Sequence, residues 1–266
     1  MSGETLLSVS GLRVVTGAKE LVRDVDLTIG RGEALGLVGE SGSGKTLTCR
    51  AVLGVLPGAC TVALGTIDLD GTDLTRLDTK GWRAVHGTRM GAVFQDPASY
   101  LNPSLPVGRQ LAEVLRVKGG LGRRAARARG LELFAAVDLR QPEAVWQQIP
   151  SHLSGGMQQR VMLAIAIACD PDLLIADEPT TALDVKTQAE IVALLRALRA
   201  RFGLSLLFVS HDLAVVSELC DRIAVFHRGE IVETAPTHEL LTQPRHPYTR
   251  SLLAPADLKG PSYAVA

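Results

Sequence analysis

Residues 39–46 of the chain are Gly39-Glu40-Ser41-Gly42-Ser43-Gly44-Lys45-Thr46, and they follow the apolar run 34–38. They match the pattern Gly-x4-Gly-Lys-Thr, in which glycines let consecutive backbone N–H groups curl around phosphate groups. Lys45 would supply a cation for the β- and γ-phosphate oxygens of ATP, and the dipole of the following helix would add to the attraction. The Thr46 hydroxyl would ligate Mg²⁺. This stretch therefore predicts a strand, a phosphate-binding loop and a helix over residues 46–56 that ends before Pro57.

Two carboxylates follow a second apolar run, residues 173–176. Asp177 stands at the end of a predicted strand, where it can hold Mg²⁺ through the metal's water shell. Glu178 comes next and can accept a proton from a water aligned on the γ-phosphate, which makes it the candidate general base. The alternative is that both carboxylates only cap a helix that begins near Pro179. The presence of residues 39–46 favours the catalytic interpretation.

A Ser-Gly-Gly run opens another predicted helix, in the stretch Leu153-Ser154-Gly155-Gly156-Met157-Gln158-Gln159-Arg160. Such a run offers bare N–H groups and a hydroxyl to an anion, although by itself it is more often a flexible loop with a helix cap. Together with the phosphate-binding loop, it makes the chain resemble the ABC ATPase family. The resemblance implies that Ser154, Gly155 and Gly156 contact the γ-phosphate of ATP held by the opposite subunit.

Three further positions match that family in the right order. Gln95 follows the apolar run 91–94 and resembles the Q-loop glutamine, which touches Mg²⁺ or the attacking water and senses the transporter. Ala182-Leu183-Asp184 resembles the D-loop, which makes Asp184 a nucleotide-binding residue. His211 ends a predicted strand and resembles the switch histidine of the catalytic site, although a lone histidine there is more often only a satisfied polar residue.

The resemblance covers nearly the whole chain and narrows to the ATPase subunits of oligopeptide, dipeptide and nickel importers. It rests on Phe94-Gln-Asp-Pro97, Leu101-Asn-Pro103 and His246-Pro-Tyr-Thr-Arg-Ser-Leu-Leu253, and Leu53-Gly-Val-Leu-Pro57 is most similar to the nickel type. It implies a motor that powers uptake through two transmembrane permease subunits and pairs with a second, different ATPase subunit. It also implies a substrate-binding protein on the outer side and a location at the cytoplasmic face of the inner membrane. Whether the cargo is a peptide or nickel stays open.

The pattern of the remaining chain indicates an α/β fold. Short apolar runs in residues 6–29 and the alternation at Ile67 and Leu69 predict antiparallel strands. Helical spacing of apolar residues fills residues 106–150. A strand, a helix and a second strand follow in residues 173–209, which predicts a parallel sheet covered by helices. The residues expected to share one face of that helix are Ile191, Leu194, Leu195 and Leu198.

With the family resemblance, we expect a P-loop NTPase built on a RecA-like parallel sheet. An antiparallel β subdomain would lie at the N-terminus, and a helical subdomain of about residues 98–165 would be inserted in the core. The expected ABC ATPase domain is residues 1–255, and residues 256–266 would form a short tail.

Composition argues against several other kinds of function. Lysine and arginine together number 28, as do aspartate and glutamate, so no global charge favours nucleic acid as a partner. The longest apolar stretch, Val161 to Cys169, is too short to cross a bilayer, and the N-terminus does not resemble a signal peptide. The four cysteines are widely spaced, which argues against a metal cluster or a disulfide framework.

Two other functions compete with the importer motor. A soluble ABC ATPase that acts on DNA or ribosomes usually carries long coiled-coil insertions or two ATPase units, whereas this chain has one unit with a short span between Lys45 and Ser154. A small-molecule kinase with a P-loop would not account for the Ser-Gly-Gly run together with Gln95 and His211.

The chain departs from the family at the adenine site. ABC proteins usually stack an aromatic ring on the base ahead of the P-loop, but residues 1–81 contain no Phe, Tyr or Trp. Thr16 stands near the expected position, and we expect aliphatic contact from Val14 or Val15 instead. An aromatic from the partner, or from a distant segment such as Tyr248, is the alternative.

Overall fold

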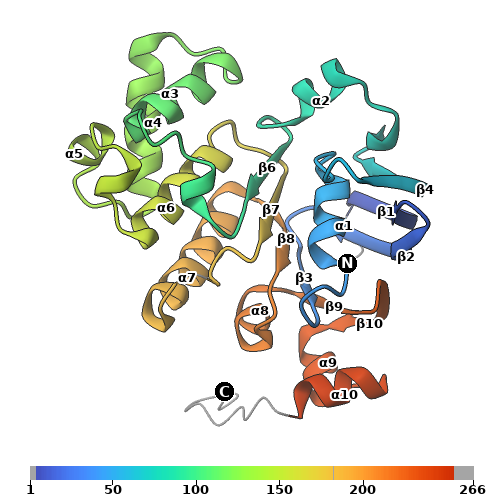
Figure 1. Ribbon diagram of the computed structural model, residues 1–266. Helices are drawn as coiled ribbons and strands as arrows, with labels where there is room; N and C mark the ends of the chain where they lie inside the picture. Colours follow the sequence, from blue (N-terminus) through green and yellow to red (C-terminus); the bar gives the residue numbers. More distant parts are fainter. Residues whose placement is uncertain (1–3, 182, 255–266) are drawn as a thin grey trace.

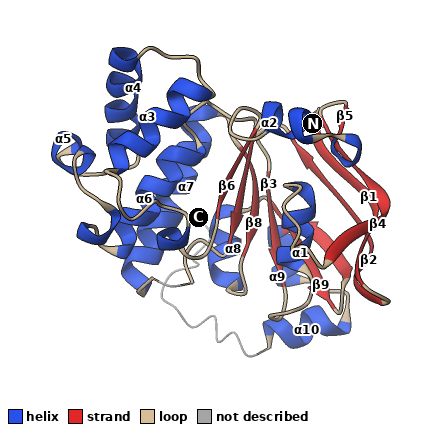
Figure 2. Ribbon diagram, turned by 45° about the horizontal axis from the view of Figure 1, so that its top comes forward, coloured by secondary structure: helices blue, strands red, loops and turns tan. Residues whose placement is uncertain are grey.

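The computed structural model describes residues 4–181 and 183–254. Its centre is a six-stranded sheet in the order β10-β9-β3-β8-β7-β6, and a four-stranded sheet in the order β2-β1-β4-β5 lies beside it. Figures 1 and 2 show helices α3 to α6 gathered on one side of the central sheet and the four-stranded sheet on the other. The C-terminal helices α9 and α10 lie next to β9 and β10 (Figure 1).

The strands of the two sheets differ widely in length, from two to twelve residues. They are β1 (Thr5–Thr16), β2 (Lys19–Gly30), β3 (Ala34–Val38), β4 (Cys60–Leu69), β5 (Thr72–Asp73), β6 (Met90–Val93), β7 (Leu173–Asp177), β8 (Ser205–Val209), β9 (Arg222–His227) and β10 (Glu230–Pro236).

The α-helices fall into a central set, a group of four between β6 and β7, and a C-terminal pair. They are α1 (Lys45–Val52), α2 (Thr79–Val85), α3 (Val107–Val117), α4 (Arg123–Ala136), α5 (Pro142–Trp146), α6 (Gly155–Ala166), α7 (Val185–Phe202), α8 (Leu213–Leu219), α9 (Thr237–Thr242) and α10 (Pro247–Leu253).

The central sheet is parallel except at one edge. Strand β3 pairs in parallel with β8 and β9, and β7 pairs in parallel with β6 and β8. Every residue of β3, β7 and β8 is buried, which is the pattern expected of strands covered on both faces. β10 joins β9 as an antiparallel hairpin through a turn at Arg228-Gly229. The predicted α/β fold, with its antiparallel N-terminal sheet and parallel core, is confirmed.

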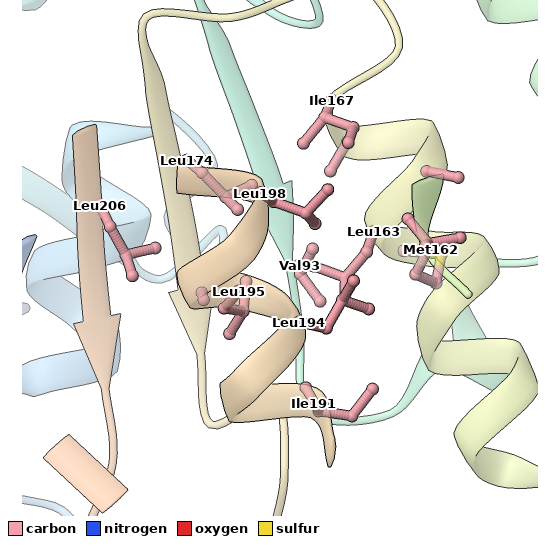
Figure 3. Packing of buried hydrophobic residues seen from close by; sticks show 14 of the residues in the cluster. Val93, Met162, Leu163, Ile167, Leu174, Ile191, Leu194, Leu195, Leu198 and Leu206 are labelled. Atoms are coloured by element: carbon pink, nitrogen blue, oxygen red, sulfur yellow. The ribbon is translucent and has the colours of Figure 1, made fainter. Parts of the chain in front are cut away.

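Two apolar clusters hold these layers together because alternate residues of each buried strand face opposite sides. Leu35, Leu37 and Leu207 pack with α1 and the four-stranded sheet. On the other face, Leu174 and Leu206 pack with α6 and α7. Figure 3 shows the apolar face of α7 turned toward these strands; the four α7 residues predicted to share that face are Ile191, Leu194, Leu195 and Leu198.

Helix α6 joins the helical group to the sheet. A Cβ added to Gly91 of β6 would lie 2.2 Å from the carbonyl oxygen of Ala166, so only glycine allows the strand and the end of α6 to approach so closely. The buried cluster runs without a break from α3 and α4 through α6 to α7. The start of α6 is therefore carried by a well-packed helix.

Helix α1 ends earlier than the sequence pattern predicts. We expected it to continue to Leu56 and to end before Pro57, but its last residue is Val52. Gly54 takes a left-handed conformation with φ of 65°, and the backbone N of Val55 bonds back to the carbonyl oxygen of Arg50 at 2.9 Å. This is a glycine C-cap, which ended the helix before the proline was reached.

Candidate nucleotide-binding site

The phosphate-binding loop runs from the end of β3 to the first turn of α1. Lys45 is 4% exposed, and its ammonium group donates to the carbonyl oxygens of Gly39 (2.7 Å) and Glu40 (2.9 Å). Burial lowers the pKa of Lys45, while the nearby carboxylates of Glu178 and Asp177 act in the opposite direction. The loop thus places a cation at a helix N-terminus, where an anionic phosphate is favoured.

Strand β9 supports this loop from behind. Gly39 has φ of 149°, and a Cβ there would lie 2.2 Å from the carbonyl oxygen of Phe226. The backbone N of Gly229 donates to the carbonyl oxygen of Ser43 at 2.8 Å. Within the described residues, the buried Ser43 hydroxyl has no hydrogen-bond partner. A phosphate oxygen is a partner of the right kind for it.

Asp177 and Thr46 meet at the edge of the loop. The Thr46 hydroxyl donates to Asp177 Oδ1 at 3.0 Å, and Asp177 is 6% exposed. Burial raises the pKa of Asp177 and the neighbouring Glu178 adds to the rise, whereas the bond from Thr46 lowers it. Two oxygen atoms of the type that Mg²⁺ prefers therefore lie side by side next to the P-loop lysine.

Glu178 is held by contacts from two neighbouring segments. Its backbone is in a left-handed conformation, with φ of 49°, and its backbone N donates to the carbonyl oxygen of Val209 at 3.0 Å. Its carboxylate accepts a bond from the Thr181 hydroxyl at 2.9 Å and lies 3.5 Å from Nδ1 of His211. The predicted base and the predicted switch histidine are therefore neighbours.

These groups open on one cavity of about 620 Å³. The residues that line it come from α1, from the segment after β6, from the ends of β7 and β8, and from the loops that follow: Ser41, Thr46, Arg50, Phe94, Gln95, Asp96, Ser99, Tyr100, Asp177, Glu178, Thr181 and His211. The structure thus brings together Thr46, Gln95, Asp177, Glu178 and His211, as the sequence pattern predicts.

The Ser-Gly-Gly run lies away from the described lining of this cavity, at the exposed start of α6. The Ser154 hydroxyl caps that helix by accepting a bond from the backbone N of Met157 at 3.3 Å. Asp184 caps α7 in the same way, and bonds from Thr187 lower its pKa. Ala182, the first residue of the predicted D-loop, lies outside the described residues.

Sequence reasoning missed part of the cavity wall and misjudged one residue. Thr181, which bonds to Glu178, and the stacked rings of Phe94 and Tyr100, 4.6 Å apart, were not predicted as site residues. The Glu-Pro-Thr-Thr run after Asp177 was the available signal for Thr181. Val14 is fully buried, so of the two aliphatic contacts expected with adenine only the one from Val15, which is half-buried, stays a prediction.

Comparison with known families decides how this arrangement is classified. The sequence model described as "ABC transporter" matches residues 22–181, a range that contains the P-loop, Gln95, the Ser-Gly-Gly run, Asp177 and Glu178. The chain belongs to the ABC transporter family. It is thus an ABC ATPase, and the cavity beside its P-loop is the candidate nucleotide site.

Similar ABC ATPases include named transport proteins. The oligopeptide transport ATP-binding protein OppD of Bacillus subtilis is 44% identical over 239 residues, which cover 90% of this chain and 67% of OppD. The probable D,D-dipeptide transport ATP-binding protein DdpD of Escherichia coli is 43% identical over 238 residues, which cover 89% of this chain and 73% of DdpD.

Solved structures of ABC ATPases resemble the fold closely. A dimeric post-hydrolysis state of the ATP-binding cassette MJ0796, bound to ADP and Pi, has a TM-score of 0.77 and 28% identity, and covers 87% of this chain and 99% of its own. The ABC transporter component cbiO1 of Clostridium perfringens, with a TM-score of 0.79 and 24% identity, shares the fold; the match covers 90% of this chain and 92% of cbiO1.

We expect Asp177→Asn to stabilise the nucleotide-free ABC ATPase by about 1 kcal/mol at pH 7. Gains of this size are typical when a side chain that destabilises the fold at a functional site is replaced. The substitution removes a buried carboxylate and keeps an oxygen for Thr46. Because the pKa of Asp177 is raised in the folded chain, the wild type loses stability as the pH rises through that pKa. The gain should therefore shrink toward zero at about pH 3, where both side chains are neutral.

Urea denaturation at both pH values measures this difference. Asp184→Asn is the control, and it should lower the stability of the folded chain at neutral pH. The pKa of Asp184 is lowered in the folded chain, so its carboxylate stabilises the fold there. Equal stability of Asp177→Asn and the wild type at pH 7 would mean that the burial of Asp177 carries no net cost.

Proposed function

We propose that this ABC ATPase is the motor subunit of a peptide importer and that it binds and hydrolyses Mg²⁺-ATP in the cavity beside Lys45. The observation that carries the proposal is the convergence of Thr46, Asp177, Glu178 and His211 on one cavity next to a buried lysine. This set supplies a phosphate cradle, metal ligands and a base.

The side chains fit a magnesium ion. Thr46 and Asp177 offer two hard oxygen ligands, and Mg²⁺ at nucleotide sites usually takes only one or two protein ligands beside phosphate and water. When bound, the ion would neutralise charge on the phosphate oxygens. Lys45 and the loop amides would hold the phosphates, and Gln95 would face the metal or the attacking water from the wall of the cavity.

Glu178 is the proposed general base. Its carboxylate lies at the cavity, oriented by Thr181, with His211 beside it. It would take the proton of the water that attacks the γ-phosphate. His211, which is half exposed, would contact the γ-phosphate and hold Glu178 in place.

The site would be completed by a second ATPase subunit. Ser154, Gly155 and Gly156 belong to a helix start that does not line the cavity of the same chain, and the N–H groups of such a start are suited to a phosphate. The solved MJ0796 cassette, which shares this fold, is a dimer. The proposed helical subdomain, about residues 98–165, would carry its Ser-Gly-Gly run to the partner's nucleotide, and we propose a different chain as that partner.

Two permease subunits would receive the movement. Among the described residues, no helix has the length and apolar character needed to span a membrane. An apolar cavity of about 330 Å³ lies between the end of α1, β6, α3 and α6, and Phe94 lines both this cavity and the nucleotide cavity. A permease segment seated there would touch Phe94, the residue next to Gln95, and would hold the ATPase at the cytoplasmic face of the inner membrane.

Peptides are the proposed cargo. OppD and DdpD, which carry oligopeptide and dipeptide transport in their names, match this chain along most of its length. A dipeptide transport protein of Haemophilus influenzae, DppD, matches it at 43% identity. A substrate-binding protein outside the membrane would choose the peptide, and the ATPase would not touch it.

Glu178→Gln should leave ATP binding intact and slow hydrolysis by about 10²- to 10⁴-fold, because only the proton acceptor is lost. Steady-state hydrolysis and nucleotide binding in the assembled complex measure the two effects separately. Lys45→Ala should abolish binding instead. The matched control is Glu218→Gln, an exposed glutamate of α8, which should hydrolyse ATP normally. Hydrolysis at the wild-type rate by Glu178→Gln would exclude this residue as the base.

Ser154→Arg should test the shared site. The isolated variant should bind ATP like the wild type, because its own cavity is untouched, whereas the assembled complex should lose about 10²-fold or more in hydrolysis rate. Ala128→Arg introduces the same side chain at an exposed position of α4 and should be neutral. A dilute, verified monomer that turns over as fast as the complex would contradict the shared site.

Transport itself is the final test of the proposed function. Membrane vesicles that contain the ATPase pair and the permeases, with the binding protein outside, should accumulate a labelled oligopeptide only when ATP is present on the ATPase side. Glu178→Gln should remove uptake. Uptake of Ni²⁺ in place of peptide would overturn the peptide cargo while leaving the motor function in place.

A further inference from the structure

Helix α10 reaches the phosphate-binding loop through one side chain. The hydroxyl of Tyr248 lies 3.2 Å from the backbone N of Glu40 and accepts a hydrogen bond from it. The two residues are 208 positions apart in the chain, so this contact ties the C-terminal helix to the first turn of the loop. The ring of Tyr248 packs on the ring of His227, with centroids 3.8 Å apart.

The bonded amide belongs to a peptide group that also holds the P-loop lysine. The carbonyl of Gly39 and the N–H of Glu40 are the two polar ends of one planar peptide unit. The ammonium group of Lys45 donates to the Gly39 carbonyl at 2.7 Å, and the N–H of Glu40 donates to Tyr248. Each bond polarises the peptide in the sense that strengthens the other. The orientation of this one peptide plane therefore links Tyr248 to Lys45.

Tyr248 is itself firmly anchored. The carboxylate of Glu233, on β10, accepts bonds from the backbone N of Arg245 (2.8 Å) and of His246 (3.0 Å). Nδ1 of His246 then accepts a bond from the backbone N of Tyr248 at 3.2 Å, which caps the start of α10. The position of the Tyr248 hydroxyl is thus fixed through Glu233 of the β9–β10 hairpin.

The β9–β10 hairpin also contacts the phosphate-binding loop directly. His227, beneath the ring of Tyr248, ends β9, and two residues later the backbone N of Gly229 donates to the carbonyl of Ser43. The outer side of the phosphate-binding loop is therefore held at Glu40 by α10 and at Ser43 by the turn between β9 and β10.

We propose that Tyr248 is a positioning residue of the nucleotide site, which orients the Gly39–Glu40 peptide and through it the ammonium group of Lys45. This role rests on the proposed function, since it requires that Lys45 binds ATP. It assigns a role to the His246-Pro-Tyr-Thr run, which the nucleotide cavity itself does not use. Loss of the hydroxyl frees the peptide to rotate, so the loop must be ordered again each time that nucleotide binds.

Tyr248→Phe isolates the hydroxyl, because the ring that packs on His227 is kept. We expect the dissociation constant of Mg²⁺-ATP to rise by about threefold to tenfold, the range of one neutral hydrogen bond. Calorimetric titration of the full-length chain measures it, together with thermal unfolding without nucleotide. In the assembled complex, KM for ATP should rise by the same factor, and kcat should stay unchanged.

Ser251→Ala is the matched control. It removes another hydroxyl of α10, which bonds within the helix to the carbonyl of Tyr248 at 2.8 Å. Weaker ATP binding in Tyr248→Phe alone, with both variants unfolding at the wild-type temperature, supports the proposal. Wild-type affinity in Tyr248→Phe overturns it, and so does an equal loss in both variants that follows a lower unfolding temperature. Absence of ATP binding in the wild type would instead overturn the proposed function.

Discussion

A buried ammonium group at the carboxyl end of a parallel sheet must be surrounded by oxygen atoms, and the rest of the site depends on this requirement. Removing a charge from water without partners is very costly. Here the partners of Lys45 are two backbone carbonyls of its own loop, which can turn inward only because the loop folds back on itself. That fold brings Gly39 against the backbone of β9, where a Cβ would not fit. One buried cation thus constrains the loop, the glycine and the strand behind it.

The parallel order of the sheet explains why residues so distant in sequence share one cavity. Strands β3, β6, β7 and β8 run in the same direction, so the residues that follow them emerge at the same edge. The P-loop follows β3, Gln95 follows β6, Asp177 ends β7, and His211 follows β8. Ligand sites of open α/β sheets lie at this edge for the same reason. The order of the strands, more than any local motif, assembles the site.

Local patterns in the sequence were enough to predict most of this arrangement. The phosphate-binding loop, the strand-end carboxylates and the apolar face of α7 each combine residue type with short-range spacing, which a single sequence displays. The predicted end of α1 was wrong because the glycine cap at Gly54 ends the helix before the chain reaches Pro57. Val14 was considered because of its distance along the chain from the phosphate-binding loop, and that distance does not show how deeply a side chain is buried. The bond between Tyr248 and Glu40 leaves no local signal at all, since it joins two segments through tertiary packing.

The starts of α6 and α7 carry the two capping residues that the proposed shared site would use. Each helix begins with a capping residue, Ser154 or Asp184, whose side chain accepts a hydrogen bond from a backbone N–H of that helix. The two starts also touch: a Cβ on Gly156 would lie 2.8 Å from Cγ2 of Thr187, and one on Gly155 would lie 3.7 Å from Leu183. A larger residue at position 156 would therefore push the two helices apart. Under the proposed shared site, a partner's nucleotide that reached Ser154 would meet Asp184 in the same approach. Since α7 follows directly from the segment that contains Glu178 and Thr181, the partner's nucleotide and the chain's own base would then be linked through a single short stretch of backbone.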